Sequence, residues 1–163
     1  MLFNAAVCRL DTAGDSFVSL LAWSHNDTIA AIATLTLDER NDTETFQVQL
    51  MNTDGEIIPN SSINHSCEAL CIDWQPNGRI LSIGWADGLV QCWMVDGKNK
   101  PTITFSNSTQ HHDSAISVLK WNPFGKRLIS GDKKGQICIW SVDPRGTTNY
   151  SIFMLTFFFT NLF

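Results

Sequence analysis

Short apolar segments separated by turn residues make up most of the chain, and they predict β-strands. Ala69–Trp74 and Ile116–Trp121 are both strand-like runs that end in tryptophan. A turn sequence follows each run at once, QPNG from Gln75 and NPFG from Asn122. Proline presets φ at the second turn position and glycine supplies a positive φ, so we expect the chain to reverse at both places.

Two further strands are predicted after each turn: Arg79–Ala86 and Leu89–Val95 in one segment, Arg127–Asp132 and Gln136–Val142 in the other. The Asp87-Gly88 dipeptide between the first two is a strong signal for a tight hairpin, and Lys134-Gly135 takes its place in the second segment. Both faces of Leu89–Val95 are apolar, so we expect a sheet that is covered on both sides by like sheets.

The two segments are copies of one repeat. Shifting the sequence against itself by 47 positions aligns the segment that begins at His65 with the one that begins at His112. The identical pairs on this offset are His65/His112, Trp74/Trp121, Pro76/Pro123, Gly78/Gly125, Leu81/Leu128, Gly84/Gly131, Gly88/Gly135, Trp93/Trp140, Val95/Val142 and Asp96/Asp143. Chance does not place so many identities on one offset without a gap, so we expect the two segments to fold alike.

A fainter copy comes first in the chain. Its predicted strands are Phe17–Trp23, Ile29–Leu37 and Thr45–Asn52. Trp23 stands 51 residues before Trp74, and the polar loop Asp38–Glu44 lengthens the hairpin of this unit. Ile103–Ser106 is a candidate outer strand for the second unit. The pattern therefore predicts an all-β fold of about three small antiparallel sheets.

Composition narrows the class of function. The 163 residues are 44% hydrophobic and 17% charged, which excludes a disordered tail, a collagen-like fibre and a multispanning membrane protein. The net charge is −5, which does not fit the basic character expected of a nucleic-acid-binding protein. No secretory signal is visible, so we expect a cytoplasmic protein whose five cysteines are reduced and packed as small hydrophobic residues.

The repeat resembles the WD40 repeat of β-propellers. It shares the period, a histidine nine residues before a strand-final tryptophan, a Pro-x-Gly turn, a hairpin glycine and a tryptophan on the third strand. The resemblance covers residues 17–145 and implies an incomplete WD40-type β-propeller of about three four-stranded antiparallel blades. Neither full unit ends in Trp-Asp, because the sequence has Trp93-Met94 and Trp140-Ser141 there.

In WD40 blades, a histidine, the hairpin aspartate and the third-strand tryptophan belong to a buried hydrogen-bond network. The resemblance implies this structural role for five residues, His65, Asp87, Trp93, His112 and Trp140. The third unit has Lys134 at the position of Asp87, so we expect its network to be incomplete.

Within the WD40 family, the order of a degenerate first unit and two full units is similar to the N-terminal propeller of an intraflagellar transport complex A subunit. The sequences GWADG from Gly84 and SGD from Ser130 carry most of this similarity. It implies a non-catalytic interaction scaffold for retrograde ciliary transport and cilium assembly, located in the cilium, with other complex A proteins as partners. The alternatives are a WD40 adaptor outside cilia and an enzyme on a propeller framework.

The expected organisation is an N-terminal strand or arm over residues 1–16, a partial propeller over 17–145 and a hydrophobic tail over 146–163. The units lie at about 17–58, 65–106 and 112–145. Three units are fewer than the roughly 4–8 blades that close a propeller, so we expect a truncated chain. The apolar end, 151–163, is shorter than the roughly 20 residues of a membrane span, and Tyr150–Phe159 is a candidate outer strand instead.

Few side chains carry candidate chemistry. His65 and His112 occupy matching repeat positions, which favours a structural role over catalysis with the neighbouring Ser114. The spacing of His65, Cys67 and Cys71 has a faint metal-site character, but no second pair supplies the remaining ligands of a structural zinc site. We therefore expect no catalytic residue, no metal and no cofactor.

The tryptophans separate into repeated and unrepeated positions. Those expected to anchor the core are Trp23, Trp74, Trp93, Trp121 and Trp140. Trp85 breaks the repeat, because its counterpart is Asp132, and it is therefore the candidate residue for an interaction surface. The basic pairs Lys126-Arg127 and Lys133-Lys134 are expected to form solvated hairpin surface.

Overall fold

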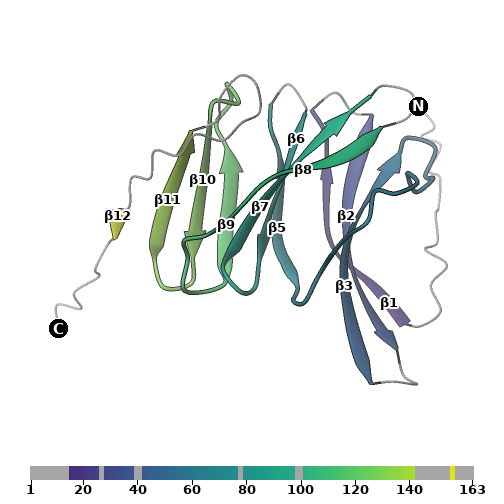
Figure 1. Cartoon of the computed structure of the whole chain (residues 1–163), viewed down its shortest axis with the longest axis horizontal. Coiled ribbons are helices and arrows are strands. Elements are labelled where there is room, and N and C mark those ends of the chain that lie inside the picture. The colour runs from purple at the N-terminus through teal and green to yellow at the C-terminus, as the bar shows by residue number, and fades with distance from the viewer. Residues whose placement is uncertain are drawn as a thin grey trace, which may run out of the picture.

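All regular structure in the described part of the chain is β-structure (Figure 1). The computed structural model describes residues 15–25, 28–38, 42–76, 79–97, 101–141 and 155–156. The strands are β1 (Asp15–Trp23), β2 (Ile29–Asp38), β3 (Thr43–Asn52), β4 (Ile63–His65), β5 (Ala69–Trp74), β6 (Ile80–Trp85), β7 (Leu89–Asp96), β8 (Thr102–Gln110), β9 (Ile116–Trp121), β10 (Arg127–Asp132), β11 (Gln136–Ser141) and β12 (Leu155–Thr156). None of these ranges contains a helix that could cross a lipid bilayer.

The strands form three four-stranded antiparallel sheets, each built from consecutive strands. The first sheet contains β1–β4, the second β5–β8 and the third β9–β12, and in each the strands lie in chain order. The sheets stand side by side like sectors of a ring that is not closed (Figure 1). The predicted all-β, propeller-like fold is therefore confirmed.

The strands of the second sheet, β5–β8, come almost entirely from the second sequence repeat, which begins at His65. His65, the first residue of the second repeat, is the last residue of β4 and pairs with Phe46 of β3 in the first sheet. The outer strand of the second sheet, β8, runs beyond the expected Ile103–Ser106 because it pairs along the whole of β7. In the third sheet, Leu155–Thr156 pairs with β11. These two residues belong to Tyr150–Phe159, the candidate outer strand.

Several sequence-based expectations lie on residues outside the described ranges. These are most of the N-terminal arm, most of the hydrophobic tail, Cys8, the turn residues Asn77 and Gly78, and the end of the third unit after Ser141. The four described cysteines are unpaired, and Cys92 and Cys138 are buried. Burial raises the pKa of the Cys92 thiol to about 11, which keeps it protonated at neutral pH.

Two hydrophobic clusters fill the spaces between the sheets. One joins the first and second sheets around Leu50, Trp74 and Trp85, and the other joins the second and third around Ile116 and Trp140. The second sheet contributes to both clusters, so it is covered on both faces, as the apolar pattern of its third strand predicts.

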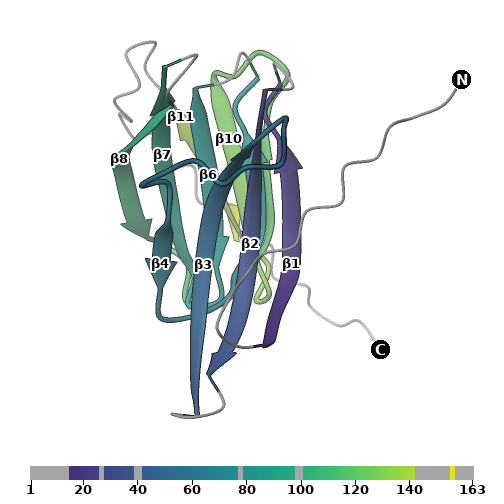
Figure 2. The same ribbon diagram turned by 90° about the vertical axis from the view of Figure 1, so that its right-hand side faces the viewer.

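The tryptophans that end the first strands of the second and third sheets also donate a hydrogen bond to the preceding sheet. The indole Nε1 of Trp74 donates to the carbonyl of Ala22 at 3.1 Å, and that of Trp121 donates to Ser82 Oγ at 3.1 Å. Trp23 occupies the equivalent place on β1, and it is 50% exposed rather than buried. The expectation that Trp23 is a core anchor is therefore wrong here, because no described segment covers this face of the first sheet (Figure 2).

Candidate functional site

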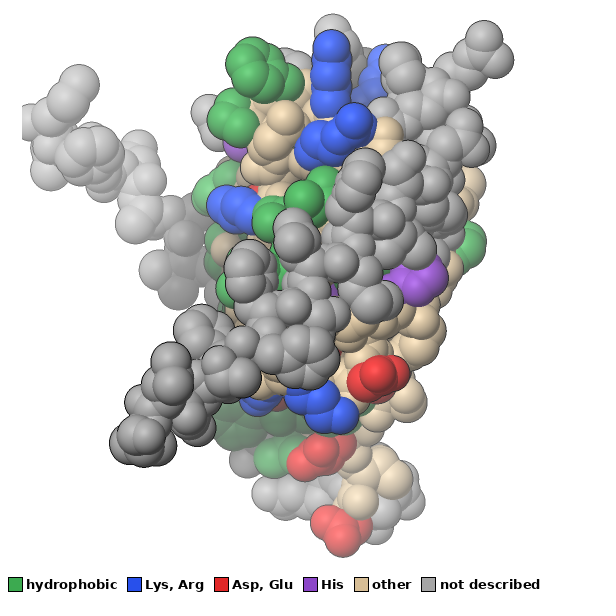
Figure 3. Space-filling view, turned by 90° about the vertical axis from the view of Figure 1, so that its left-hand side faces the viewer, with side chains coloured by type: hydrophobic (Ala, Val, Ile, Leu, Met, Phe, Trp, Pro, Cys, Tyr) green, Lys and Arg blue, Asp and Glu red, His purple; other side chains and the backbone are tan. Residues whose placement is uncertain are grey.

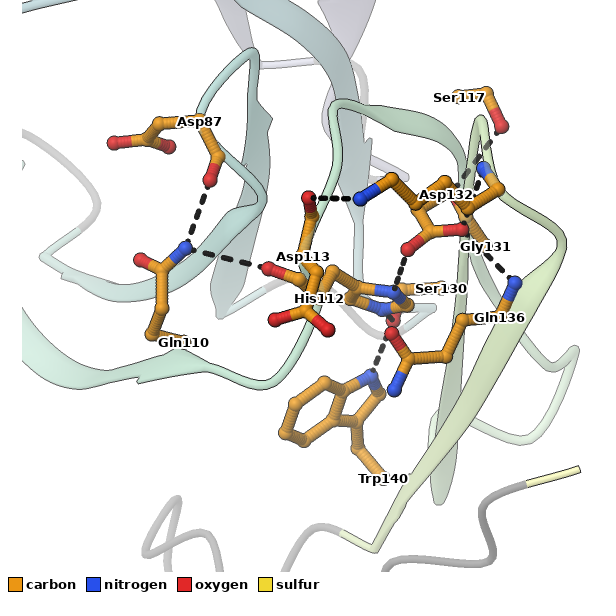
Figure 4. A network of polar contacts seen from close by, with 11 residues as sticks. Asp87, Gln110, His112, Asp113, Ser117, Ser130, Gly131, Asp132, Gln136 and Trp140 are labelled. Carbon is orange, nitrogen blue, oxygen red and sulfur yellow. Dashed lines mark hydrogen bonds and ion pairs between the residues drawn. The ribbon is translucent and has the colours of Figure 1, made fainter. Parts of the chain in front are cut away.

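The polar centre of the third sheet is built around one serine hydroxyl. Ser130 Oγ lies 2.7 Å from Nε2 of His112 and accepts a hydrogen bond from the indole Nε1 of Trp140 at 2.9 Å (Figure 4). His112 precedes β9, Ser130 lies on β10 and Trp140 on β11, so the contacts tie the incoming loop to two strands. All three side chains are buried.

Asp132 completes this network from the end of β10. Its Oδ2 lies 3.3 Å from Nδ1 of His112, and both side chains are fully shielded from solvent. An ionised carboxylate can only accept, so we assign the proton of neutral His112 to Nδ1, which leaves Nε2 to accept the Ser130 hydroxyl. Burial lowers the pKa of His112 more than the nearby Asp132 raises it.

The expectation that Lys134 leaves this network incomplete is wrong. The carboxylate comes from Asp132, two residues earlier, whose Oδ1 accepts the backbone N–H groups of Lys134 and Gln136 across the turn. Asp132 therefore contacts the histidine and caps the hairpin at the same time. The ammonium of Lys134 donates instead to the carbonyl of Asp113 at 3.3 Å.

The second sheet carries a different arrangement. His65 Nε2 lies 2.8 Å from Asp87 Oδ2, as the resemblance implies for this pair. Trp93 does not contact this pair through its indole nitrogen, which donates instead to Gln91 Oε1 at 3.4 Å. The residue that aligns with Ser130 is Ile83, and it has no hydroxyl that could join histidine to tryptophan.

Trp85 is part of this arrangement, so its expected role as a surface contact is wrong. Its side chain has 0% exposure, its ring lies 4.4 Å from that of His65, and its Nε1 donates to Gln91 Oε1 at 3.0 Å. Trp85 breaks the repeat because it fills the interior beside His65, whereas its counterpart Asp132 places its carboxylate 3.3 Å from Nδ1 of His112. Sequence alone shows the break and not the direction of the side chain.

Asp87 is fixed by three separate contacts. Besides the bond to His65, its Oδ1 accepts the N–H of Leu89, and its carbonyl accepts Gln110 Nε2 at 2.8 Å. Burial acts to raise the pKa of Asp87, but the hydrogen bonds from His65 and Leu89 outweigh it, so the pKa is lowered. The carboxylate therefore stays ionised at neutral pH.

Gln110 and Gly88 connect the second-sheet hairpin to the third unit. Gln110 Nε2 also contacts the carbonyl of His112 at 3.4 Å (Figure 4). Gly88 has φ of 89°, and a Cβ placed on it would lie 2.4 Å from the same carbonyl oxygen. Polar contacts thus run without interruption from His65 to Trp140, and we call this series the polar chain.

The polar chain contains the residue types of a hydrolytic triad without the access that one needs. Ser130, His112 and Asp132 have the required order of contacts, but Ser130 has 0% exposure and its oxygen is bonded to Trp140. Asp113 is exposed, whereas His112 is buried. The arrangement is therefore suited to holding the loops rigid.

Two apolar surfaces are exposed at the ends of the row of sheets. On β1 the exposed side chains are Phe17, Val18, Leu21 and Trp23. On the third sheet Val118 and Ile129 line an open groove of about 460 Å³. Figure 3 looks at this end of the molecule and shows hydrophobic side chains with Lys and Arg above and below them.

The basic residues at this end do not form one cluster. Lys126-Arg127 stands at the start of β10 and Lys133-Lys134 just beyond its other end, a separation of about 20 Å along the strand. All four are exposed, in agreement with solvated hairpin surface.

A group of possible metal ligands lies at the β6–β7 hairpin of the second sheet. Side-chain atoms of His65, Cys67 and Asp87 all lie within 4.8 Å of one another. Cys71 is not part of this group, because its Sγ is directed to the carbonyl of Ile116 in the third unit.

Comparison with solved structures shows the fold. The mitotic checkpoint complex contains a chain that matches with a TM-score of 0.63 and 20% identity, over 90% of this chain and 40% of that one. Sqt1 from Chaetomium thermophilum matches with a TM-score of 0.69 and 16% identity, over 88% of this chain and 38% of that one. A chain of the COPII outer coat vertex on membranes matches with a TM-score of 0.61 and 23% identity, over 81% of this chain and 36% of that one.

These neighbours are WD40 propellers, and the chain spans about 40% or less of each. A search among curated proteins found no significant match. The sequence profile described as "IFT140 first beta-propeller" matches residues 7–157, nearly the whole chain. The three sheets, the WD40-like repeat and this match together show that the chain belongs to the IFT140 first β-propeller family.

Proposed function

We propose that the chain acts as a non-catalytic protein-interaction scaffold, as the N-terminal propeller part of an intraflagellar transport complex A subunit. The match of residues 7–157 to the IFT140 first β-propeller is the observation that carries this proposal. In that role the chain serves retrograde transport and assembly of the cilium, and its partners are other proteins of the complex. Propellers of this kind generally act by presenting surfaces to other proteins.

The distribution of polar groups supports a scaffold rather than an enzyme. The buried group around Ser130, which resembles a catalytic constellation, is closed to solvent and bonded internally. Some of the exposed features are apolar, such as the groove beside Val118 and the turn residue Phe124, which is 76% exposed. Exposed apolar side chains on a rigid framework are typical of surfaces that bind proteins.

A solved neighbour illustrates this use of the fold. One structure of Chaetomium thermophilum Sqt1 contains the N-terminus of the ribosomal protein L10, and it matches this chain with a TM-score of 0.69 and 15% identity. The likeness concerns the fold and not the partner, so the partner of this chain has to be found by experiment.

Affinity purification from ciliated cells tests the proposal. The tagged 163-residue chain is expected to recover other complex A proteins, identified by mass spectrometry. The matched control is Gly88→Ala, which disturbs the packing of the second hairpin against His112 and is expected to reduce recovery.

Two results would favour the alternatives. Recovery of a set of partners without any complex A protein, in ciliated and non-ciliated cells alike, would indicate an adaptor outside cilia. Hydrolase turnover that is abolished by His112→Gln would indicate an enzyme, and it would contradict the closed environment of Ser130.

A further inference from the structure

Three chemically different ligand atoms meet at the boundary between the first and second sheets. His65 is the last residue of β4, Cys67 lies on the connection to β5, and Asp87 stands in the turn between β6 and β7. Their ligand atoms lie within 4.8 Å of one another, and Nε2 of His65 is 2.8 Å from Oδ2 of Asp87. The group joins an outer strand of one sheet to a hairpin of the next.

The donor set fits a zinc-like divalent ion. Imidazole nitrogen, thiolate sulfur and carboxylate oxygen are all zinc ligands, at about 2.0–2.3 Å from the metal. Tetrahedral coordination at those lengths places the donors about 3.3–3.6 Å from one another. The hydrogen-bonded His65–Asp87 pair would open slightly and Cys67 would draw closer, so only side-chain adjustments of about 1 Å are needed.

The repeat shows that the fold itself does not require this trio. The residues that align with Cys67 and Asp87 in the third unit are Ser114 and Lys134, and that unit keeps the same sheet and hairpin. His112, the counterpart of His65, contacts Ser130 and Asp132 instead. The second unit thus has three possible metal ligands at these positions, whereas the third unit has only the histidine and forms the same sheet.

The site is both accessible and held in place. Asp87 is exposed, whereas His65 and Cys67 are half-buried, so an ion can enter from solvent. The N–H of Leu89 and the side chain of Gln110 already fix the Asp87 hairpin. Zinc binds cysteine as the thiolate, so binding would release the thiol proton of Cys67 to solvent.

We propose that His65, Cys67 and Asp87 bind one zinc ion, with water at the fourth position. The ion fastens the end of β4 in the first sheet to the β6–β7 turn of the second sheet. Because the ligands are brought together only by folding, binding stabilises the arrangement of these two sheets.

Cobalt(II) titration of the full chain tests the site, since cobalt replaces zinc and reports thiolate coordination by near-ultraviolet charge-transfer absorption. The expected result is a band that saturates at one cobalt per chain and that zinc removes. Cys67→Ser should abolish the band, and serine is compatible with the fold because the aligned residue of the third unit is Ser114. Cys71→Ser is the matched control and should keep the band, because Cys71 faces the third unit.

Thermal unfolding with and without excess zinc is the second measurement. Zinc should raise the unfolding temperature of the wild type and of Cys71→Ser, and leave that of Cys67→Ser unchanged. A titration without the charge-transfer band, or a band of equal strength in Cys67→Ser, would overturn the proposed site. Either result leaves the scaffold function untouched, since that function rests on the family match.

Discussion

Ser130 is a single hydroxyl that satisfies two buried aromatic side chains. It contacts Nε2 of His112 at 2.7 Å and accepts the indole N–H of Trp140 at 2.9 Å. Each buried polar group left without a partner costs about 1–3 kcal/mol. Ser130 therefore stabilises the fold chiefly by giving the buried ring nitrogens of His112 and Trp140 a hydrogen-bond partner.

Ser130→Ala should lower the free energy of unfolding by about 2–4 kcal/mol, because it removes the hydroxyl that contacts both buried ring nitrogens. Chemical denaturation measures the change. Ser117→Ala is the matched control, since Ser117 is exposed and bonds only to the carbonyl of Gly131, and it should change stability by less than about 0.5 kcal/mol. Equal effects of the two substitutions would contradict the network.

Stability should decrease as pH falls below the ordinary histidine range. The pKa of His112 is lower in the folded state than in the unfolded chain, because burial disfavours the charged ring. The unfolded state then binds more protons between the two pKa values, so stability is fully present above about pH 6.5 and is lost as pH falls.

This histidine can contribute at most about 1.4 kcal/mol per pH unit, because it takes up one proton. Denaturation curves for wild type and His112→Gln between pH 7.5 and 5 isolate its contribution. The difference in unfolding free energy between the two proteins should narrow toward low pH. A difference that widens on acidification would mean that His112 is charged in the folded protein.

Residue-level roles were only partly predictable. The histidines and Trp140 stand at repeat positions, so the sequence indicates that they lie in the interior. Asp132 and Trp85 occupy the same repeat position, yet the first places a carboxylate beside a histidine and the second packs its ring against one. Such exchanges depend on side-chain packing between loop and hairpin, which no single-sequence pattern records.

Among the elements, the β6–β7 hairpin depends most on a single residue. Gly88 has a left-handed φ and lies against the carbonyl of His112, so it permits both the turn and the contact with the next unit. Gly135 is its counterpart in the third sheet, with φ of 84°, and it is exposed. The two glycines therefore share the backbone requirement and differ in packing.

Gly88→Ala should destabilise the protein by more than about 3 kcal/mol, because backbone strain and a clash with His112 add together. Gly135→Ala should cost about 1–2 kcal/mol, the strain alone. Thermal and chemical unfolding of both variants give the comparison. If Gly135→Ala were the more damaging, the close contact at Gly88 would not be present in solution.

Strand positions were well predicted because the turn chemistry is local. Proline-glycine turns and the Asp87-Gly88 dipeptide mark the reversals, and the strands of the two full repeats end within one or two residues of expectation. The extent of β8 was missed because its residues are polar and its strand character comes from pairing with β7. Pairing with a distant segment is a tertiary effect that local propensity does not contain.

At the scale of the whole molecule, the sheets are held together by contacts of β5 and β9, the first strands of the second and third sheets. Trp74 and Trp121 each donate an indole N–H to the preceding sheet, and Asp73 of the second sheet accepts the N–H of Trp121 at 2.8 Å. The repeat predicts that the sheets pack in the same way, because identical tryptophans recur at the ends of these first strands. It does not predict which tryptophan stays exposed, since that depends on what covers each outer face.

Hydrogen exchange of the tryptophan indole N–H groups tests the side-by-side packing of the three sheets most directly. The resonances are assigned by single Trp→Phe substitutions and followed by NMR after transfer to deuterated water. The indole protons of Trp74, Trp121 and Trp140 should exchange slowly, because each is donated to an acceptor in the interior, while that of the half-exposed Trp23 should exchange fast. Exchange of Trp74 and Trp121 as fast as that of Trp23 would show that the sheets do not pack on one another, and it would contradict the propeller-like architecture.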